Sequence, residues 1–278
     1  MGRYITLSIL IFTAIQNLLP CFKKKHQQKP DLNKLILQNK IDEISKILKT
    51  QKIDNKTLTE NLFFSVKNNK HKIARLLINY DIPTAYYIDI PQKIEEQITD
   101  KSFKKEIAKK IGLTINDLRL IKIVHFGFDK KYHTGKMIVH KKLAKEVVEI
   151  FTDMCKEKYP IKQIKLIDEY DANDDLSMKS NNSSALCQRY ITGSTNKYSR
   201  HSHGTAIDIN PIENPYVKEN NVYPPEGKIY KDRTKNKKGL IKVGDACWKA
   251  FTKRGWNWGG NWKKILDYQH FEKDLFKK

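Results

Sequence analysis

Residues 31–83 follow the continuous apolar run at 5–15. Within them, apolar residues recur at the spacing of an α-helix. Ile44 and Leu48 lie four positions apart, and so do Ile73 and Leu77. The two stretches align at an offset of 29 positions, near the period of about 33 that is typical of ankyrin repeats. We expect 31–83 to form a small all-helical, ankyrin-like region. Two helical hairpins packed on the rest of the chain are the alternative.

The pattern changes twice further along the chain. Residues 84–117 are polar and rich in charge, which indicates a connecting segment with a helix near 101–110. From Leu118 the apolar density rises: 121–126 has the composition of a strand. The stripe from Leu143 to Met154 predicts a helix that ends before Pro160.

The remaining segments alternate between apolar and polar. Residues 161–167 predict another strand, the polar stretch 171–184 predicts a loop, and 206–209 predicts a third strand. An order of strand, helix, strand, loop and strand is typical of an α+β domain, which we place at 118–278.

The N-terminus carries an export-like pattern over residues 1–22. Arg3 precedes an uncharged apolar run at 5–15, which has the length of a signal-peptide core rather than of a membrane span. The stretch before Cys21 is similar to a lipoprotein processing site, although Pro20 and the lysines at 23–25 depart from that pattern. We therefore expect a signal peptide or an N-terminal anchor, and a protein of the cell envelope, whether periplasmic, secreted or membrane-anchored. A buried apolar N-terminus is the alternative.

Composition narrows the classes of partner. The chain has 278 residues and a formal charge of +22, from 53 Lys and Arg against 31 Asp and Glu. Only seven of the basic residues are Arg, and no zinc-finger, basic-zipper or RNA-recognition signature is present, so we expect no specific nucleic-acid binding. We interpret most of this charge as compositional bias toward Lys. The second interpretation is that the charge attracts the protein to anionic wall polymers.

Several groups of reactive residues favour ordinary structural roles. The four cysteines contain no CxxC pair, so isolated buried thiols are favoured over a single Cys187–Cys247 bridge. Three histidines lack metal-ligand spacing, three aspartates lack an EF-hand pattern, and three tryptophans favour core packing over a cleft wall. These residues are His125, His133 and His140; Asp171, Asp174 and Asp175; and Trp256, Trp258 and Trp262.

Two short motifs carry candidate chemistry. His201 and Asp208 lie seven positions apart around Gly204, and Asp267 lies three positions before His270. Two histidines and one carboxylate leave one position of a tetrahedral zinc open, which is the catalytic arrangement. Zinc lowers the pKa of a water at such a position, and a carboxylate nearby can accept its proton. Asp267 would share a face with His270 if both lay on one helical turn.

The pair of motifs, SxHxxGxAxD and then [DE]xxH, resembles the D-alanyl-D-alanine carboxypeptidase family of zinc peptidases, the VanY-like and L-alanyl-D-glutamate peptidase group. The resemblance extends over about 118–272 and includes the stretches 181–189 and 255–262. It implies a small antiparallel sheet flanked by helices, with Zn²⁺ as the cofactor. It further implies zinc ligands and two catalytic side chains. The ligands are His201, Asp208 and His270, the general base is Asp267, and Arg189 polarises the scissile carbonyl or holds a substrate carboxylate.

Three positions leave open which bond is cleaved and which residues line and support the site. His203 stands where the family commonly has an aromatic residue, so it could line the pocket; a fourth ligand there would displace the catalytic water. Asp267 stands where the carboxypeptidases usually have Glu, and it resembles the endopeptidase branch instead. Glu272 is expected to support the site by hydrogen bonding.

Together these features predict a zinc-dependent metallopeptidase that cleaves peptidoglycan stem peptides, of the D-alanyl-D-alanine carboxypeptidase or the L-alanyl-D-glutamate endopeptidase type. A non-catalytic module that binds the cell wall is the first alternative. The second is an ankyrin-like adaptor in which 31–83 recruits a protein partner.

Overall fold

The computed structural model describes residues 31–191, 194–234 and 237–275. The expected signal peptide or anchor at 1–22, with Cys21, therefore lies outside the described residues. Within the described ranges no helix is both long enough and apolar enough to cross a membrane.

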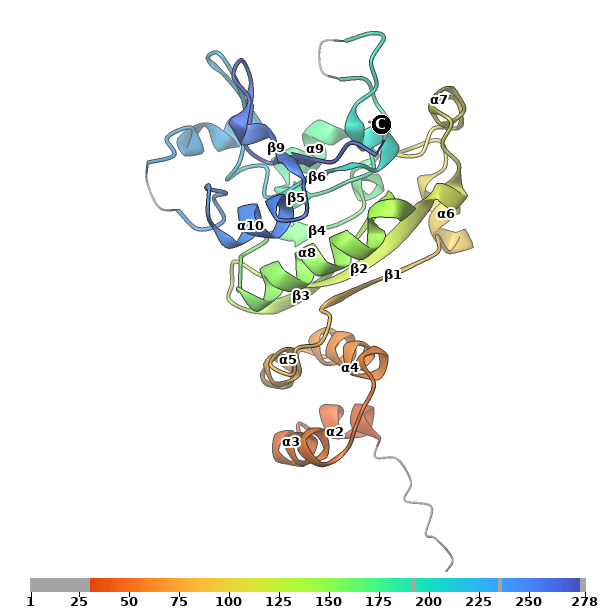
Figure 1. Cartoon of the computed structure of the whole chain (residues 1–278), viewed down its shortest axis with the longest axis vertical. Helices are drawn as coiled ribbons and strands as arrows, with labels where there is room; N and C mark the ends of the chain where they lie inside the picture. The colour runs from red at the N-terminus through yellow and green to blue at the C-terminus, as the bar shows by residue number, and fades with distance from the viewer. Residues whose placement is uncertain (1–30, 192–193, 235–236, 276–278) are drawn as a thin grey trace, which may run out of the picture. The chain divides into compact units, whose positions relative to one another are not determined.

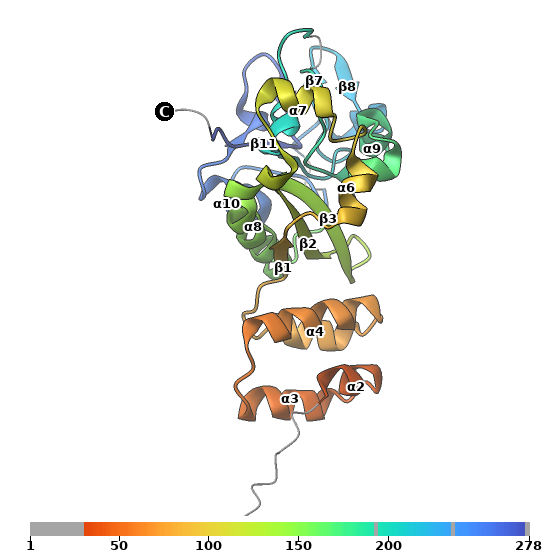
Figure 2. The same cartoon turned by 90° about the vertical axis from the view of Figure 1, so that its right-hand side faces the viewer.

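Four short helices make up the region 31–83, arranged as two successive pairs (Figures 1 and 2). They are α2 (Leu32–Leu37), α3 (Ile41–Thr50), α4 (Asn55–Lys67) and α5 (His71–Ile78). Asn39 and Asn69 both adopt φ 58° at the turns before α3 and α5. Since Asn tolerates this left-handed conformation better than most residues, it marks the equivalent turns. The turns are 30 positions apart, one more than the sequence offset of 29.

The apolar faces of these helices continue into the rest of the molecule. Ile36, Ile44 and Leu62 are buried in a cluster that also contains Val124 and Tyr132 from the sheet. The helical region is therefore packed on the following domain, and its burial does not depend on further repeats.

The next segment begins a three-stranded antiparallel sheet of order β1–β2–β3. The strands are β1 (Ala85–Ile88), β2 (Leu118–Phe126) and β3 (Tyr132–His140). Strand β2 confirms the strand predicted at 121–126, whereas β3 was not anticipated because Thr134, Gly135 and Lys136 interrupt its apolar pattern. Strand β1 lies within 84–117, together with α6 (Gln92–Ile98), α7 (Lys105–Ile111) and the short 3-10 helix η1 (Ile115–Asp117).

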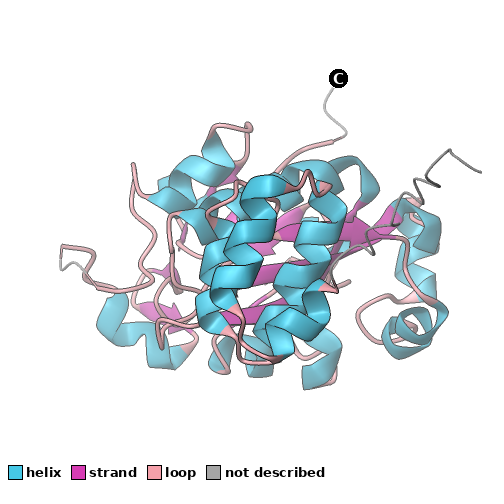
Figure 3. Ribbon diagram, turned by 90° about the horizontal axis from the view of Figure 1, so that it is seen from below, coloured by secondary structure: helices cyan, strands magenta, loops and turns pink. Residues whose placement is uncertain are grey.

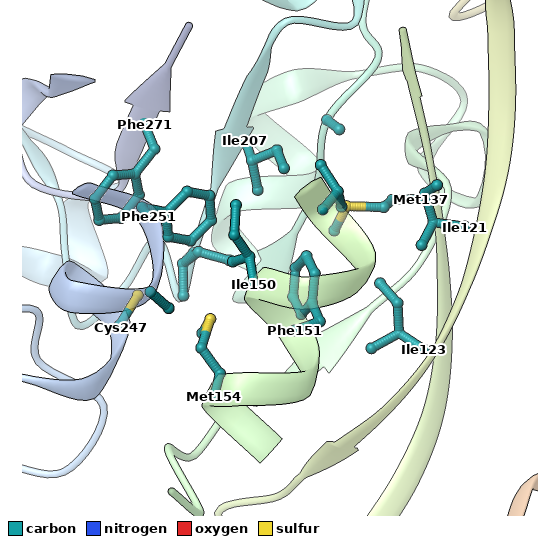
Figure 4. Packing of buried hydrophobic residues seen from close by; sticks show 14 of the residues in the cluster. Ile121, Ile123, Met137, Ile150, Phe151, Met154, Ile207, Cys247, Phe251 and Phe271 are labelled. Atoms are coloured by element: carbon teal, nitrogen blue, oxygen red, sulfur yellow. The ribbon is translucent and has the colours of Figure 1, made fainter. Parts of the chain in front are cut away.

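Helix α8 (Ala144–Lys156), which follows the 3-10 turn η2 (Lys141–Leu143), confirms the predicted helix and covers one face of this sheet. Figure 4 shows Phe151 of α8 facing the apolar side chains of β2 and β3, whereas Ile150 and Met154 lie on the side of Phe251 and Cys247. On the other side of the cluster, Phe251 and Phe271 stack with ring centroids 4.0 Å apart. This core joins α8 to the C-terminal part that carries the candidate site.

The prediction of a loop over 171–184 was wrong. The segment from 163 contains β4 (Gln163–Ile164), η3 (Ile167–Tyr170), α9 (Asp174–Lys179) and β5 (Asn182–Ser183). Asn173 caps α9 by accepting a hydrogen bond from the Leu176 N–H at 3.0 Å, and Ser177 is buried. A side-chain cap and one buried contact therefore support a helix that has little apolar periodicity.

Two small antiparallel sheets complete the structure, in the orders β6–β11–β9 and β10–β7–β8. Their strands are β6 (Ala206–Asp208), β7 (Tyr216–Lys218), β8 (Asn221–Tyr223), β9 (Asn257–Trp258), β10 (Leu266–Asp267) and β11 (His270–Glu272). The helices of this part are η4 (Arg200–His203), η5 (Pro225–Tyr230), α10 (Ala246–Thr252) and η6 (Gly259–Asn261). Mixed helices and small antiparallel sheets confirm the α+β class (Figure 3).

The three described cysteines are free and buried, as favoured from the sequence. No Cys187–Cys247 bridge forms between them. Burial raises the pKa of the Cys155 and Cys187 thiols to about 12, so both stay protonated at neutral pH.

Candidate active site

Three side chains from separate elements meet in the interior of the C-terminal half. His201 lies on η4, Asp208 at the end of β6 and His270 at the start of β11. One ligand atom from each lies within 4.8 Å of the others, and all three residues are buried. Among the described residues, this is the one group of three or more His, Cys, Asp or Glu side chains close enough to hold a metal ion.

Strand pairing accounts for two members of the group. In the antiparallel pair β6–β11, Asp208 lies directly opposite His270. Residues at such paired positions project from the same face of the sheet with their Cβ atoms about 5 Å apart. The carboxylate and the imidazole therefore meet although they are 62 positions apart in sequence.

The third member is placed by a tight turn. Gly204 ends η4 with φ +65°, and a Cβ atom there would come within 2.8 Å of the His140 backbone nitrogen. Only glycine combines this conformation with so close an approach. The glycine of the motif therefore lets η4 pack against the end of β3 and direct His201 toward β6.

Hydrogen bonds fix which ring nitrogen of each histidine faces the group. Nδ1 of His201 lies 2.7 Å from the carbonyl oxygen of Ala185, so this nitrogen donates and Nε2 faces Asp208 Oδ2 at 3.1 Å. Nε2 of His270 donates to Glu272 at 3.1 Å, which leaves Nδ1 to face Asp208 Oδ1 at 3.0 Å.

The donor atoms fit a metal ion. Nε2 of His201 and Nδ1 of His270 point at each other across 3.2 Å, and a metal ion that displaced their protons would meet both lone pairs, with the remaining protons on the outer nitrogens. Two imidazole nitrogens and a carboxylate oxygen, with the outer N–H groups bound to a carbonyl and a carboxylate, are a typical ligand set for zinc.

Asp208 and His270 each stabilise the charged form of the other. Burial opposes ionisation of Asp208, but His201 and His270 outweigh it and hold the pKa of this carboxyl well below its usual range. Burial likewise opposes the charged form of His270, whereas hydrogen bonds to Asp208 and Glu272 raise its pKa to about 10. The carboxylates therefore create a strongly cation-attracting centre.

Asp267 lies beside this group but not on a helical turn, so that sequence expectation was wrong. It ends β10, which pairs with β7, whereas His270 begins β11, which pairs with β6 and β9. Because β10 and β11 pair with different strands, the chain turns sharply between Asp267 and His270. Gly259 allows the approach, since a Cβ there would lie 2.6 Å from the Asp267 carbonyl oxygen.

The environment of Asp267 is that of a proton acceptor. Burial raises its pKa to about 6, against the opposing charge of His270. Its Oδ1 atom is buried and has no hydrogen-bond partner among the described residues. A buried carboxylate oxygen without a donor is costly, and a water or substrate proton directed at it would remove that cost.

Arg189 reaches the same cavity from the segment between β5 and η4. Its backbone N–H bonds to the Ser202 hydroxyl at 3.0 Å, and its carbonyl accepts from the same hydroxyl at 2.8 Å. These bonds tie Arg189 to η4, which carries His201.

The guanidinium of Arg189 is already paired. Its Nη2 atom lies 2.7 Å from Oδ2 of Asp174, whose side chain is 21% exposed. Burial raises the pKa of Asp174, and the charge of Arg189 opposes that rise. Sequence reasoning placed Asp174 in a solvated loop and missed this contact, because nothing in the sequence connects α9 with a residue 15 positions later.

A cavity of about 390 Å³ contains the group. Tyr216, Tyr223 and Trp262 are aromatic residues of its wall, and the ring of Trp262 lies 5.5 Å from that of His270. Trp256 and Trp258, by contrast, are 3% and 6% exposed and belong to the core. The tryptophans therefore divide between the two roles considered for them.

The other residues singled out in the sequence lie outside this group. His203 is not among the residues that line the cavity. His125 is buried in β2, and His133 contacts Asp129 at 2.9 Å. Asp171 is exposed and lies 4.0 Å from Lys101. His140 caps η2 through a hydrogen bond from the Lys142 N–H.

Comparison with known proteins agrees with the motif. No curated protein and no solved structure matches the chain. Residues 192–273 match the family model described as D-alanyl-D-alanine carboxypeptidase, a family that is typically metal-dependent. The matched stretch includes His201, Asp208, Asp267 and His270. The match thus supports the D-alanyl-D-alanine carboxypeptidase family and a peptidase that acts on peptidoglycan-type peptides.

Proposed function

We propose that the chain is a zinc-dependent peptidase of the bacterial cell envelope that hydrolyses peptidoglycan stem peptides. The observation that carries the proposal is the buried group of His201, Asp208 and His270 beside Asp267, in one cavity. Three protein ligands of the N, N, O type leave a coordination position open, which is the arrangement of catalytic rather than structural zinc.

Bound at this position, zinc would act as a Lewis acid and would lower the pKa of a water molecule toward about 7. The residues of the chain supply the proton transfers and the orientation. Asp267 accepts a proton from the attacking water and delivers it to the leaving amine. Arg189 donates a hydrogen bond to the scissile carbonyl oxygen as negative charge develops there. Glu272 and the Ala185 carbonyl hold the two histidine rings in the required tautomers.

The regions around the site suit an envelope location in this proposal. A signal peptide or anchor at 1–22 would export the domain, and the charge of +22 would favour adsorption to anionic wall polymers, screened by salt. The paired helices α2–α5 would act as an ankyrin-like region that recruits a protein partner.

The proposal is tested by metal content and product analysis on the purified protein. We expect about one zinc ion per chain and cleaved stem peptides when muropeptides are digested and their masses measured. His270→Ala should lose both tight zinc binding and cleavage. His133→Ala, which changes an exposed histidine outside the cavity, is the matched control and should keep both.

A non-catalytic wall-binding module is the alternative outcome. In that case the wild type would bind sacculi without detectable turnover, and Asp267→Asn would bind them equally well. Wild-type protein that retains no zinc after dialysis and digests no muropeptide would overturn the peptidase proposal.

A further inference from the structure

The strand that carries Asp267 is too short to hold its own position. Strands β7 and β10 pair through two residues each, Leu266 with Val217 and Asp267 with Tyr216. A two-stranded pair of this length is marginally stable by itself, and β8 adds only three residues on the other side of β7. The position of Asp267 in the cavity therefore depends on the contacts that fix these strands to the rest of the domain.

Arg233 fixes the chain just before β7. Its Nη1 atom donates to the Glu213 carbonyl oxygen at 2.7 Å, and its Nη2 atom donates to Oδ1 of Asn214 at 2.9 Å. Asn214 is completely buried, and β7 begins two residues later at Tyr216. A further bond from Nη2 to the Ile241 carbonyl oxygen, at 2.8 Å, ties the same guanidinium to the segment before α10. The start of β7 is therefore attached to the domain through Arg233.

The same guanidinium contacts the residue that follows β10. The Cζ atom of Arg233 lies 4.3 Å from the ring centroid of Tyr268, which comes directly after Asp267. A cation at this distance over an aromatic ring is attracted to it. The Tyr268 backbone is held too, since its N–H donates to the Pro215 carbonyl oxygen at 3.4 Å and its carbonyl oxygen accepts from Trp258 Nε1 at 2.8 Å. Arg233 thus joins the two strands at the end of the pair that holds Asp267.

Arginine suits this role because its side chain is charged, planar and rich in donors. The oxygens that accept from Arg233 are backbone carbonyls and one side-chain amide, all of them neutral. Burial lowers the pKa of Arg233 to about 10, and the group therefore keeps its charge at neutral pH. A planar fork of donors can form hydrogen bonds at its edge while an aromatic ring lies against its face, which an ammonium group cannot do.

We infer that Arg233 is a positioning residue for Asp267: it holds the start of β7 and the residue after β10 together, and so fixes the general base relative to the metal ligands. The inference rests on the proposed function, in which Asp267 accepts the proton of the attacking water. Arg233 is not among the residues that line the cavity, so it acts through Tyr268 and β7. His270 depends less on this contact, because it begins β11, which pairs with β6 and β9.

The test measures turnover and zinc affinity separately in the full-length, zinc-loaded protein. Arg233→Met removes the charge and the donors. We expect it to lower kcat for muropeptide cleavage about tenfold to 100-fold per folded molecule, because a displaced general base loses its reaction geometry. KM and zinc affinity should stay close to the wild-type values. Arg233→Lys keeps the charge but not the fork of donors, and should lose activity as well.

Two variants of Tyr268 test the contact itself. Tyr268→Phe keeps the ring and should keep the wild-type kcat, whereas Tyr268→Leu removes the ring and should lower kcat about tenfold. If the contact carries the effect, Arg233→Met combined with Tyr268→Leu should lower kcat by clearly less than the product of the two single losses. A double variant that shows the full product, or a Tyr268→Leu variant with wild-type kcat, would contradict the inference.

A control variant separates positioning from general stability. Arg254→Met removes another partly buried arginine, which pairs with Glu149 and Asp153 of α8. It should lower the melting temperature and leave kcat per folded molecule unchanged. A loss of kcat in Arg254→Met as large as that in Arg233→Met would show that the effect is one of stability alone.

Amide hydrogen exchange keeps the inference separate from the proposed function, because it needs no turnover. Arg233→Met should speed exchange in β7 and β10 and leave β6 and β11 unchanged. If the wild type hydrolyses no muropeptide, the peptidase proposal fails, and the exchange pattern still decides whether Arg233 positions β10. Equal exchange of β10 in the wild type and in Arg233→Met would overturn the inference.

Discussion

The two candidate ligand histidines differ in the groups that hold their outer ring nitrogens. His201 donates to a backbone carbonyl, which is fixed by the chain, whereas His270 donates to the side chain of Glu272. A carboxylate in this position orients the ring and makes the imidazole a stronger ligand. The site therefore depends on one side chain that is not itself in the three-residue group.

Replacement of Glu272 measures that dependence. We expect Glu272→Gln to weaken zinc affinity about 10–100-fold, because the neutral amide no longer favours the metal-binding tautomer of His270. Competition with a chromogenic chelator gives the affinity. Glu157→Gln, which changes an exposed carboxylate at the C-cap position of α8, should not alter the zinc affinity.

The pKa of Asp267 predicts the acid side of the pH–rate profile. A general base works when deprotonated, so activity should fall about tenfold per pH unit below its pKa. Burial raises that pKa to about 6, and a bound cation would lower it, so we expect the decline at or below about pH 6. Asp267→Asn should lose at least about 100-fold in kcat and retain zinc. A profile that is flat from pH 7 to pH 4 would exclude Asp267 as the base.

At the scale of elements, the site depends on short turns rather than on long helices or strands. Strands β6, β10 and β11 contain two or three residues each, and η4 contains four. Such elements have almost no intrinsic preference, and their conformation is set by the contacts of their ends. Gly204 and Gly259 are two positions where neighbouring backbone comes too close for a Cβ atom.

A pair of glycine substitutions separates backbone strain from close approach. Gly204 and Gly112 have nearly equal φ values of +65° and +66°, but a Cβ at Gly112 would meet nothing within 4 Å. We expect Gly112→Ala to cost about 1–2 kcal/mol of unfolding free energy from strain alone. Gly204→Ala should cost more and also weaken zinc binding, because η4 must move away from β3. Urea unfolding and zinc titration measure both effects; equal results for the two variants would contradict the packing argument.

At the scale of the whole molecule, the helical region and the domain with the candidate site share apolar contacts. Leu62 of α4 is fully buried in the cluster that includes Val124 and Tyr132. Two visible repeats would be too few for an independent repeat stack, and packing on the sheet supplies the missing partner surface. This packing agrees with the alternative drawn from the sequence, in which two helical hairpins pack on the rest of the chain.

Leu62→Ala tests whether the two regions unfold together. We expect a loss of about 2–5 kcal/mol in unfolding free energy, because the substitution leaves a cavity in a shared core. Zinc content and muropeptide cleavage per folded molecule should stay unchanged, since Leu62 does not line the site. Two separate unfolding transitions, with only the first shifted, would show instead that the helical region unfolds by itself.

The sequence by itself indicated the α+β class, β2, α8 and the His201, Asp208, Asp267 and His270 set, because periodicity and motif spacing are local properties of the chain. Only the tertiary structure decided the contacts between distant segments. The strand pairing placed Asp267 on β10 instead of a helical turn, and the packing of α9 brought Asp174 to Arg189. Both contacts join segments that are distant in the sequence. Their free energy depends on which residue each side chain meets and how deeply it is buried, and a local stretch of sequence specifies neither. The charge of +22 follows from the sequence alone. The acidic lining of the cavity arises only when folding brings its carboxylates together.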